Sequence, residues 1–395
     1  MALQSEELLN RGSLDVSADI ECGNAGSIGE PEPGRIEIAP RDDGLPPEIQ
    51  VRGPISCYNV CVQLSNRANA RLPFTLDVTI PAWLIKAGFD YFLRKTYFER
   101  PPTTLNWEAI PSSRIAILRD RVRFSMSLEP GEERIFASVP SYPYSACNEG
   151  LHALASRPHA KLITIGKSPQ GRPIISLRSG TDENKPRVVV TGTLQPGEHA
   201  AWAVLAMAEW LLESTAGQAF LNAFRVDLVP QPNPDGNVLG ACNVNSAGEM
   251  PVFACRDVTE GREAPPETSV LWQYLAQDPP LGYMDFHFLH TPNHATPKVM
   301  FPDVSLHHDQ KQRELATRVA EAVVDAGECS EVSGWRVGDP LWSQLVVYQA
   351  TEKLNTIAYL DQYTGPLSSL SGARRRGPVA LKTFLEALRQ PGRSA

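Results

Sequence analysis

Val188-Val189-Val190-Thr191-Gly192 is the stretch that decides the fold, because a short polar turn and then an almost continuous apolar segment from Ala200 to Leu212 follow it. A short β-branched run of this kind is typical of a strand that is buried on both faces of a parallel sheet. The apolar segment, in which Glu209 is the only charged residue, predicts a buried helix. A second strand is expected over 225–230. Strands that alternate with helices in this way predict an α/β domain.

The α/β pattern continues to the end of the chain. Helical periodicity over 309–326, and again over 379–388 after Pro378, predicts two further helices. The rhythm changes near Pro140, so we place the α/β domain at residues 141–395.

Two different segments precede this domain. Residues 1–48 are polar and rich in Gly, Pro and acidic residues, which predicts a flexible segment without a core of its own. In 49–140, runs such as 74–80 and 121–128 alternate apolar and polar residues, as strands with one buried face do. We therefore predict a small β-sandwich domain over 49–140.

Composition excludes several classes of partner. The formal net charge of −8 is the opposite of the clustered basic surface that nucleic-acid binding needs. No apolar run is long enough to span a membrane, and the first residues lack the positive start and apolar core of a signal peptide. Seven scattered cysteines are typical of reduced thiols. The sequence predicts a cytoplasmic protein that binds neither nucleic acid nor membrane, and leaves the oligomeric state open.

Three loops carry the residues with chemical potential. Ligands of open α/β sheets collect beyond the carboxyl ends of the strands, and here those loops lie at 194–199, 233–236 and 284–290. A carboxylate with imidazoles from separate loops is a donor set that suits zinc. A single histidine is also an ordinary hydrogen-bonded residue, and Asn-Pro-Asp-Gly is first of all a good turn, so the pattern alone leaves both interpretations open. Six of the eight histidines lie in the region concerned: His199, His287, His290, His294, His307 and His308.

A set of short motifs occurs in one order through the second half of the chain. They are 141–145, 165–174, Gln195-Pro196-Gly197-Glu198, 230–236, Pro266-Glu267 and Asp285-Phe286-His287. From about Tyr144 onward these motifs resemble the zinc metallocarboxypeptidases of peptidase family M14, in particular the cytosolic carboxypeptidase branch. That resemblance implies a mixed-sheet carboxypeptidase-like α/β catalytic domain preceded by a small all-β sandwich domain.

The resemblance implies a Zn²⁺ site. The family binds the ion through a His-x-x-Glu pair and a distant histidine, and Glu198 and His287 match two of these ligands. Gln195 stands where the first histidine is expected, and a neutral amide is a poorer zinc donor than imidazole. His199 is a candidate to supply the missing donor.

Further histidines and one acid complete the metal-site prediction. His290 and His294 are alternatives to His199 as the third donor, although surface histidines are commonly not ligands. Asp285 matches the acid that orients the histidine ligand through its outer ring nitrogen.

The residues that would bind substrate differ from the family pattern. Asn243 stands where the family has an arginine, Asn245 is retained, and Val252-Phe253 replaces a later Asn-Arg pair. Arg256 is a candidate to compensate, with Arg262 as the alternative. Since a guanidinium recognises a carboxylate through two parallel hydrogen bonds, we expect weaker recognition of a free C-terminus.

The resemblance also implies a reaction. Asp361 aligns with the family's general base, with Glu352 as the alternative if the register slips. A zinc-activated water and a carboxylate base predict hydrolysis of an amide bond in a peptide or amino-acid conjugate. Two alternatives remain open, which are a catalytically inactive relative that binds a peptide or partner, and a changed acyl-transfer reaction.

Overall fold

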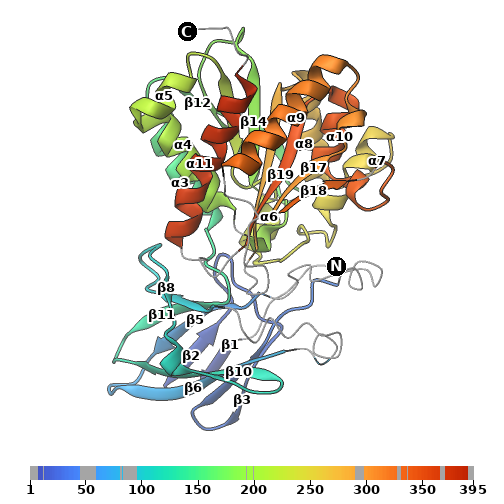
Figure 1. Ribbon diagram of the computed structural model, residues 1–395. Coiled ribbons are helices and arrows are strands. Elements are labelled where there is room, and N and C mark those ends of the chain that lie inside the picture. Colours follow the sequence, from blue (N-terminus) through green and yellow to red (C-terminus); the bar gives the residue numbers. More distant parts are fainter. Residues whose placement is uncertain are drawn as a thin grey trace.

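The computed structural model describes residues 8–11, 13–44, 59–80, 82, 96–192, 194–198, 200–289, 298–326, 331–335, 337–364 and 370–389. These residues form an all-β domain and an α/β domain (Figure 1). The predicted fold class, a mixed-sheet α/β domain preceded by a small β-sandwich, is confirmed.

The all-β domain consists of two sheets that enclose one core. Buried side chains such as Val16, Ile36, Leu76 and Phe124 alternate with exposed ones along their strands and meet between the sheets. The first sheet has the order β1 (Leu8–Arg11), β2 (Leu14–Ser17), β5 (Cys61–Asn66), β11 (Glu133–Ala137), β7 (Phe98–Arg100) and β8 (Glu108–Ala109). The second has the order β3 (Ser27–Glu32), β4 (Arg35–Ala39), β6 (Leu72–Thr79), β10 (Arg121–Leu128) and β9 (Ile115–Ile117).

The structure corrects the prediction for residues 1–48. Four strands, β1 to β4, lie in this segment, and Ile36 and Ile38 of β4 are almost fully buried in the sandwich core. The Gly and Pro residues that suggested flexibility occupy the turns, for example Gly34 between β3 and β4, which has a φ of +76°. The segment has no core of its own because it shares the core of the following strands.

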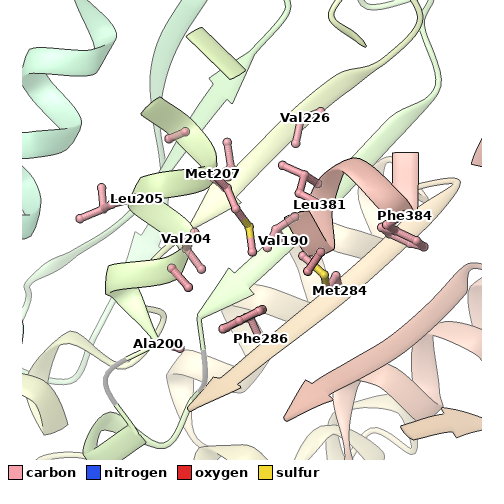
Figure 2. Packing of buried hydrophobic residues seen from close by; sticks show 14 of the residues in the cluster. Val190, Ala200, Val204, Leu205, Met207, Val226, Met284, Phe286, Leu381 and Phe384 are labelled. Carbon is pink, nitrogen blue, oxygen red and sulfur yellow. The ribbon is translucent and has the colours of Figure 1, made fainter. Parts of the chain in front are cut away.

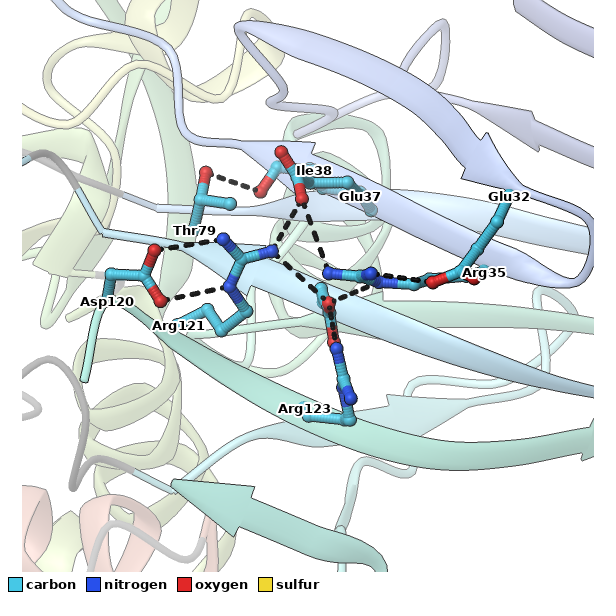
Figure 3. A network of polar contacts seen from close by, with 9 residues as sticks. Glu32, Arg35, Glu37, Ile38, Thr79, Asp120, Arg121 and Arg123 are labelled. Atoms are coloured by element: carbon cyan, nitrogen blue, oxygen red, sulfur yellow. Dashed lines mark hydrogen bonds and ion pairs between the residues drawn. The ribbon is translucent and has the colours of Figure 1, made fainter. Parts of the chain in front are cut away.

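A buried carboxylate ties three strands of the second sheet together. Asp77 in β6 accepts hydrogen bonds from Arg123 Nε at 2.7 Å and Arg35 Nε at 2.9 Å, which come from the neighbouring strands β10 and β4. Figure 3 shows the two arginines, Arg123 and Arg35, pointing toward each other. Burial alone would raise the pKa of Asp77, but the hydrogen bonds from Arg123 and Arg35 lower it overall. Asp77 therefore stays charged and fixes the register of these strands.

The α/β domain is built on a mixed eight-stranded sheet. β14, β15, β16 and β19 run parallel at its centre, so that their carboxyl ends meet at one edge. The sheet has the order β12 (Ala160–Lys167), β13 (Pro173–Ser179), β15 (Arg225–Val229), β14 (Arg187–Gly192), β16 (Gly282–Leu289), β19 (Ile357–Thr364), β17 (Lys298–Pro302) and β18 (Glu331–Trp335).

Helices cover both faces of this sheet (Figure 1). One face is covered by α3 (Tyr144–Ala155), α4 (Ala201–Glu213), α9 (Gln310–Asp325) and α11 (Leu370–Leu388). The other is covered by α7 (Cys255–Thr259), α8 (Pro266–Gln277) and α10 (Val346–Leu354). The shorter helical segments are α5 (Thr215–Phe220), α6 (Pro234–Val238), η2 (Ser112–Arg114), η3 (Pro196–Glu198), η4 (Pro251–Phe253), η5 (Val304–Leu306) and η6 (Trp342–Gln344).

The helices predicted from periodicity are present. α4 and α9 match the expected ranges, and the side chain of Asp309 caps α9 by accepting a hydrogen bond from the backbone of Gln312. α11 begins at Leu370 rather than after Pro378, so this proline lies inside the helix. No helix among the described residues is long and apolar enough to cross a membrane.

The larger core lies between the central strands and α4 and α11. Val190 in β14 and Phe286 in β16 point toward this layer, where they meet Val204 and Met207 of α4 (Figure 2). Phe384 of α11 packs edge-on against the buried ring of Tyr359 in β19, with ring centroids 5.0 Å apart. This packing fixes the orientation of every side chain along β16 and β19, since successive residues of a strand face opposite sides.

The all-β domain meets the α/β domain at the loops beyond the central strands. Asn24 Nδ2 donates to the backbone oxygen of Gly240, and Cys22 N donates to Val238 O at 3.0 Å. Arg41 Nη2 donates to Leu239 O at 2.7 Å. The N-terminal domain therefore contacts the loop edge where ligands of such sheets collect.

Phe384→Ala should lower the free energy of unfolding by about 3–5 kcal/mol, because it removes a fully buried ring from the interface of α11 and β19. Denaturant unfolding followed by circular dichroism measures the change. Val379→Ala in the same helix is the matched control, since Val379 is exposed and should cost less than about 0.5 kcal/mol. Equal losses in the two variants would contradict this account of the core.

Candidate functional site

The candidate site lies at the carboxyl ends of β14 and β16. The chain leaves β14 at Gly192 and forms the short helix η3, whose last residue is Glu198. β16 runs beside β14 with Thr191 opposite Asp285, so that its following residues reach the same edge. Adjacent parallel strands thus bring the 195–198 segment and residues 285–287 together.

A continuous chain of polar contacts joins these two segments. Glu198 Oε2 lies 2.7 Å from His287 Nδ1, and Asp285 Oδ2 lies 3.1 Å from His287 Nε2. The hydroxyl of Thr191 donates to Asp285 Oδ1 at 2.8 Å. Glu198, Asp285 and His287 are all at least nine-tenths buried. Asp285 therefore holds the ring of His287 with Nδ1 directed toward Glu198.

The two carboxylates set the protonation of the histidine. Burial by itself lowers the pKa of His287, but the charges of Glu198 and Asp285 outweigh it and raise the pKa to about 10. The imidazole is thus positively charged at neutral pH in the arrangement shown. A metal ion at Nδ1 would have to displace that proton, since histidine binds metals in its neutral form.

Gln195 and Asn243 contact each other beside this chain. Gln195 Nε2 donates to Asn243 Oδ1 at 2.7 Å, and both side chains are buried. Asn233, which follows β15 and caps α6, joins the same loops by donating to the backbone oxygens of Leu194 and Val244. The Gln195 side chain therefore has its amide nitrogen directed at Asn243.

Two further predicted binding residues serve the loops themselves. Asn245 donates to Glu249 at 2.9 Å and to Glu267 at 3.0 Å, and its amide oxygen accepts from the backbone. Arg256 lies in α7, where its guanidinium pairs with Glu260 one turn later. Among the described residues, neither side chain contacts Glu198 or His287.

Asp361 points to the opposite face of the sheet from His287. Asp361 is paired with Phe286 and Gln362 with His287, so that Asp361 shares the face of Tyr359 rather than that of Asp285. Arg376 of α11 donates to Asp361 Oδ2 at 2.9 Å. The structure therefore does not bring Asp361 to the Glu198–His287 pair.

Burial governs the Asp361–Arg376 pair. Burial raises the pKa of Asp361 to about 7, although the charge of His287 opposes the shift, and burial lowers the pKa of Arg376 to about 10. Both shifts disfavour the charged forms, so the carboxylate and the guanidinium depend on their 2.9 Å contact to remain charged inside the core.

The other candidates lie elsewhere or outside the described residues. Three of the candidate histidines lie outside the described residues, namely His199, His290 and His294. His307 Nδ1 contacts Asn355 Oδ1, and His308 Nε2 contacts the backbone oxygen of Glu352 in α10. Glu352 itself pairs with Lys353.

The residues that the structure describes do not complete a zinc site. A catalytic zinc ion is held by three protein side chains, and no group of three His, Cys, Asp or Glu among the described residues is arranged to hold a metal ion. Glu198 and His287 supply two donors, and the amide nitrogen of Gln195, which has no affinity for a cation, is bonded to Asn243.

Sequence reasoning missed two residues of the all-β domain. Asp43 Oδ2 accepts hydrogen bonds from the backbone nitrogens of Cys242 and Asn243, both at 2.8 Å. Asn59 Nδ2 donates to Gly197 O at 3.3 Å. No local pattern marks either residue, because each acts through a contact more than a hundred residues away in the chain.

Comparison with known proteins confirms the resemblance to zinc carboxypeptidases. A model of the zinc carboxypeptidase family matches residues 148–249, which contain Gln195, Glu198 and Asn243. The cytosolic carboxypeptidase branch stays a prediction. No curated protein matches this chain.

Solved metallocarboxypeptidases share the fold. The metallo-carboxypeptidase from Burkholderia cenocepacia superposes with a TM-score of 0.76 at 16% identity, over 95% of this chain and 99% of that one. The metallo-carboxypeptidase from Pseudomonas aeruginosa, in complex with (2-guanidinoethylmercapto)succinic acid, gives 0.74 at 20% identity, over 95% and 100%. Carboxypeptidase A from Helicoverpa armigera covers only 64% of this chain, with a TM-score of 0.50 and 17% identity. The bacterial structures therefore share the two-domain architecture, including most of the all-β domain.

Arg376→Met should lower the free energy of unfolding by about 3–5 kcal/mol, because it leaves the Asp361 carboxylate buried without its cation. The double variant Asp361→Leu/Arg376→Met should recover most of that loss, since an apolar pair of similar volume is tolerated in such a place. Urea unfolding of the wild type, both single variants and the double variant measures the coupling. A double variant as unstable as Arg376→Met would show that the pair is not a self-contained element of the core.

Proposed function

We propose that this chain is a binding protein on a metallocarboxypeptidase fold, which takes a peptide or an amino-acid conjugate at the loops around Gln195 and Asn243 without cleaving it. The fold and the family match support descent of the site from a peptide hydrolase. The proposal follows from what the described residues of that site retain and lack.

The orientation of Asp361 carries the proposal. Amide hydrolysis on this fold needs a carboxylate base beside the metal-binding pair. In β19, Leu360 and Gln362 lie on the face of the sheet that carries His287, because Gln362 pairs with His287. The only carboxylate in this part of the strand is bonded to Arg376 on the other face. The described part of β19 thus offers no base to the Glu198–His287 pair.

The altered polar residues support binding rather than reaction. Gln195 and Asn243 stand where the resemblance implies a zinc ligand and an arginine, and they hydrogen-bond to each other instead. Both are neutral, so they neither activate water nor stabilise developing negative charge as a metal and a guanidinium do. Buried amides with fixed partners are suited to recognition of polar groups.

Hydrolysis remains the second candidate, and one observation favours it. Glu198 Oε2 and His287 Nδ1 lie 2.7 Å apart, with the outer nitrogen of the ring held by Asp285. A carboxylate on the outer ring nitrogen is the usual support of a metal-binding histidine. On this candidate His199 supplies the third donor, and a peptide or amino-acid conjugate is the substrate.

Zinc content and peptide hydrolysis separate the two candidates. After incubation with excess zinc and removal of free metal, the protein should hold well below one zinc ion per chain by elemental analysis, because two described donors are too few. The same sample should not release arginine from benzoylglycyl-arginine, although calorimetry should detect binding of that peptide.

Two variants make this result informative. If the wild type held stoichiometric zinc and lost it in Glu198→Ala, with hydrolysis lost in parallel, the hydrolase would replace the binding protein. Glu249→Ala is the matched control, since Glu249 bonds Asn245 at the edge of the same loop and should leave zinc content unchanged.

A further inference from the structure

Asp43 brings a carboxylate from the all-β domain into the loop that carries Asn243. Its Oδ2 accepts the backbone nitrogens of Cys242 and Asn243, each at 2.8 Å. Its Oδ1 is buried and has no hydrogen-bond partner. Burial raises the pKa of this carboxyl, although the hydrogen bonds from Asn243 and Cys242 oppose the shift. One oxygen of Asp43 therefore still requires a donor.

Two amide side chains beside Asp43 also have a buried polar atom without a hydrogen-bond partner. Asn59 is 5% exposed, and its Nδ2 donates to Gly197 O whereas its Oδ1 has no partner. Asn243 is fully buried, and its Oδ1 accepts from Gln195 whereas its Nδ2 has no partner.

These three groups belong to one place. Asn59 N donates to Cys242 Sγ at 3.2 Å, and Asp43 binds the backbone of that same cysteine. A Cβ placed on Gly197 would lie 2.7 Å from Asn59 Nδ2 and 2.8 Å from the Cα of Cys242, which shows how closely the segments approach. Two acceptors and one donor without partners are therefore gathered around Cys242.

The resemblance implies a positive charge at position 243, whereas this chain has a neutral side chain there and a carboxylate beside it. Asn243, a neutral residue, stands where an arginine is expected, and Asp43 adds a negative charge. The guanidinium of Arg41 lies near enough to act on the Asp43 charge, but its Nη2 donates to Leu239 O. A ligand group that carries both N–H donors and positive charge satisfies the two acceptors, because charge-assisted hydrogen bonds are the stronger ones.

We infer that Asp43, Asn59 and Asn243 form a subsite for a cationic amino or guanidino group of the ligand. This inference rests on the proposed function, because it assumes that these loops bind a ligand. The cation lies between Asp43 Oδ1 and Asn59 Oδ1. Asn243 Nδ2 donates to an adjacent oxygen of the ligand. The all-β domain thus determines which ligands the α/β domain accepts.

Calorimetry with agmatine and with N-carbamoylputrescine tests the subsite without a peptide. The two probes have nearly the same shape, but agmatine ends in a guanidinium and N-carbamoylputrescine in a neutral urea. Wild type should bind agmatine at least about tenfold more tightly than the urea, the factor expected of one charge-assisted contact. Asp43→Asn should bring the two affinities within about twofold of each other. Asp42→Asn, with the same change in charge at an exposed neighbour, should keep the preference.

A second variant covers the possibility that Asp43→Asn does not fold. Asn243→Arg supplies an internal guanidinium to Asp43 and should abolish the preference for agmatine. Equal binding of the two probes to wild type, or a preference that survives in both Asp43→Asn and Asn243→Arg, would overturn the subsite. Benzoylglycyl-arginine reports separately on the proposed function. If it fails to bind while agmatine is preferred, the peptide-binding function fails and the subsite stands.

Discussion

The contact between Glu198 and His287 is the interaction on which the site depends. It joins the segment after β14 to the end of β16 through a distance of 2.7 Å, and Asp285 and Thr191 fix the ring from behind. Because both residues are buried, separating them would leave a charged group in the protein interior without its partner, which is energetically unfavourable. Any function of this edge, whether metal binding or ligand recognition, begins from that pair.

The alternation of side chains along a strand then limits what the pair can do. A shift of one residue in a strand sends a side chain to the other face of the sheet. β19 is fixed by Tyr359, whose ring packs against Phe384 in the core, so Asp361 two residues later must lie on the α11 side. Arg376 meets it there. Packing of the core, rather than the local sequence, therefore separates this carboxylate from the site.

The sequence was sufficient for features that repeat along the chain and insufficient for those set by distant contacts. The run at 188–192 and the apolar segment at 200–212 predicted β14 and α4. The ordered motifs named Glu198, Asp285 and His287 as candidates, and the structure has these three side chains in contact. Residues 1–48 were wrongly predicted to be flexible because of their Gly and Pro residues, which occupy turns between short strands. The side chains of these strands pack against residues that come later in the chain. Asp43 and Asn59 could not be found, since their partners Cys242 and Gly197 are far away in the sequence.

The altered positions are coupled to one another by contacts. Gln195 and Asn243 share a buried hydrogen bond, so that an arginine restored at 243 alone would leave the Gln195 amide without that acceptor, and a histidine restored at 195 alone would remove the partner of Asn243. Asp43 accepts a hydrogen bond from the backbone nitrogen of Asn243, the position at which the resemblance implies a positively charged arginine. The two domains therefore share these polar contacts. A single reversion cannot return this site to the family pattern, because the altered residues Gln195 and Asn243 are hydrogen-bonded to each other.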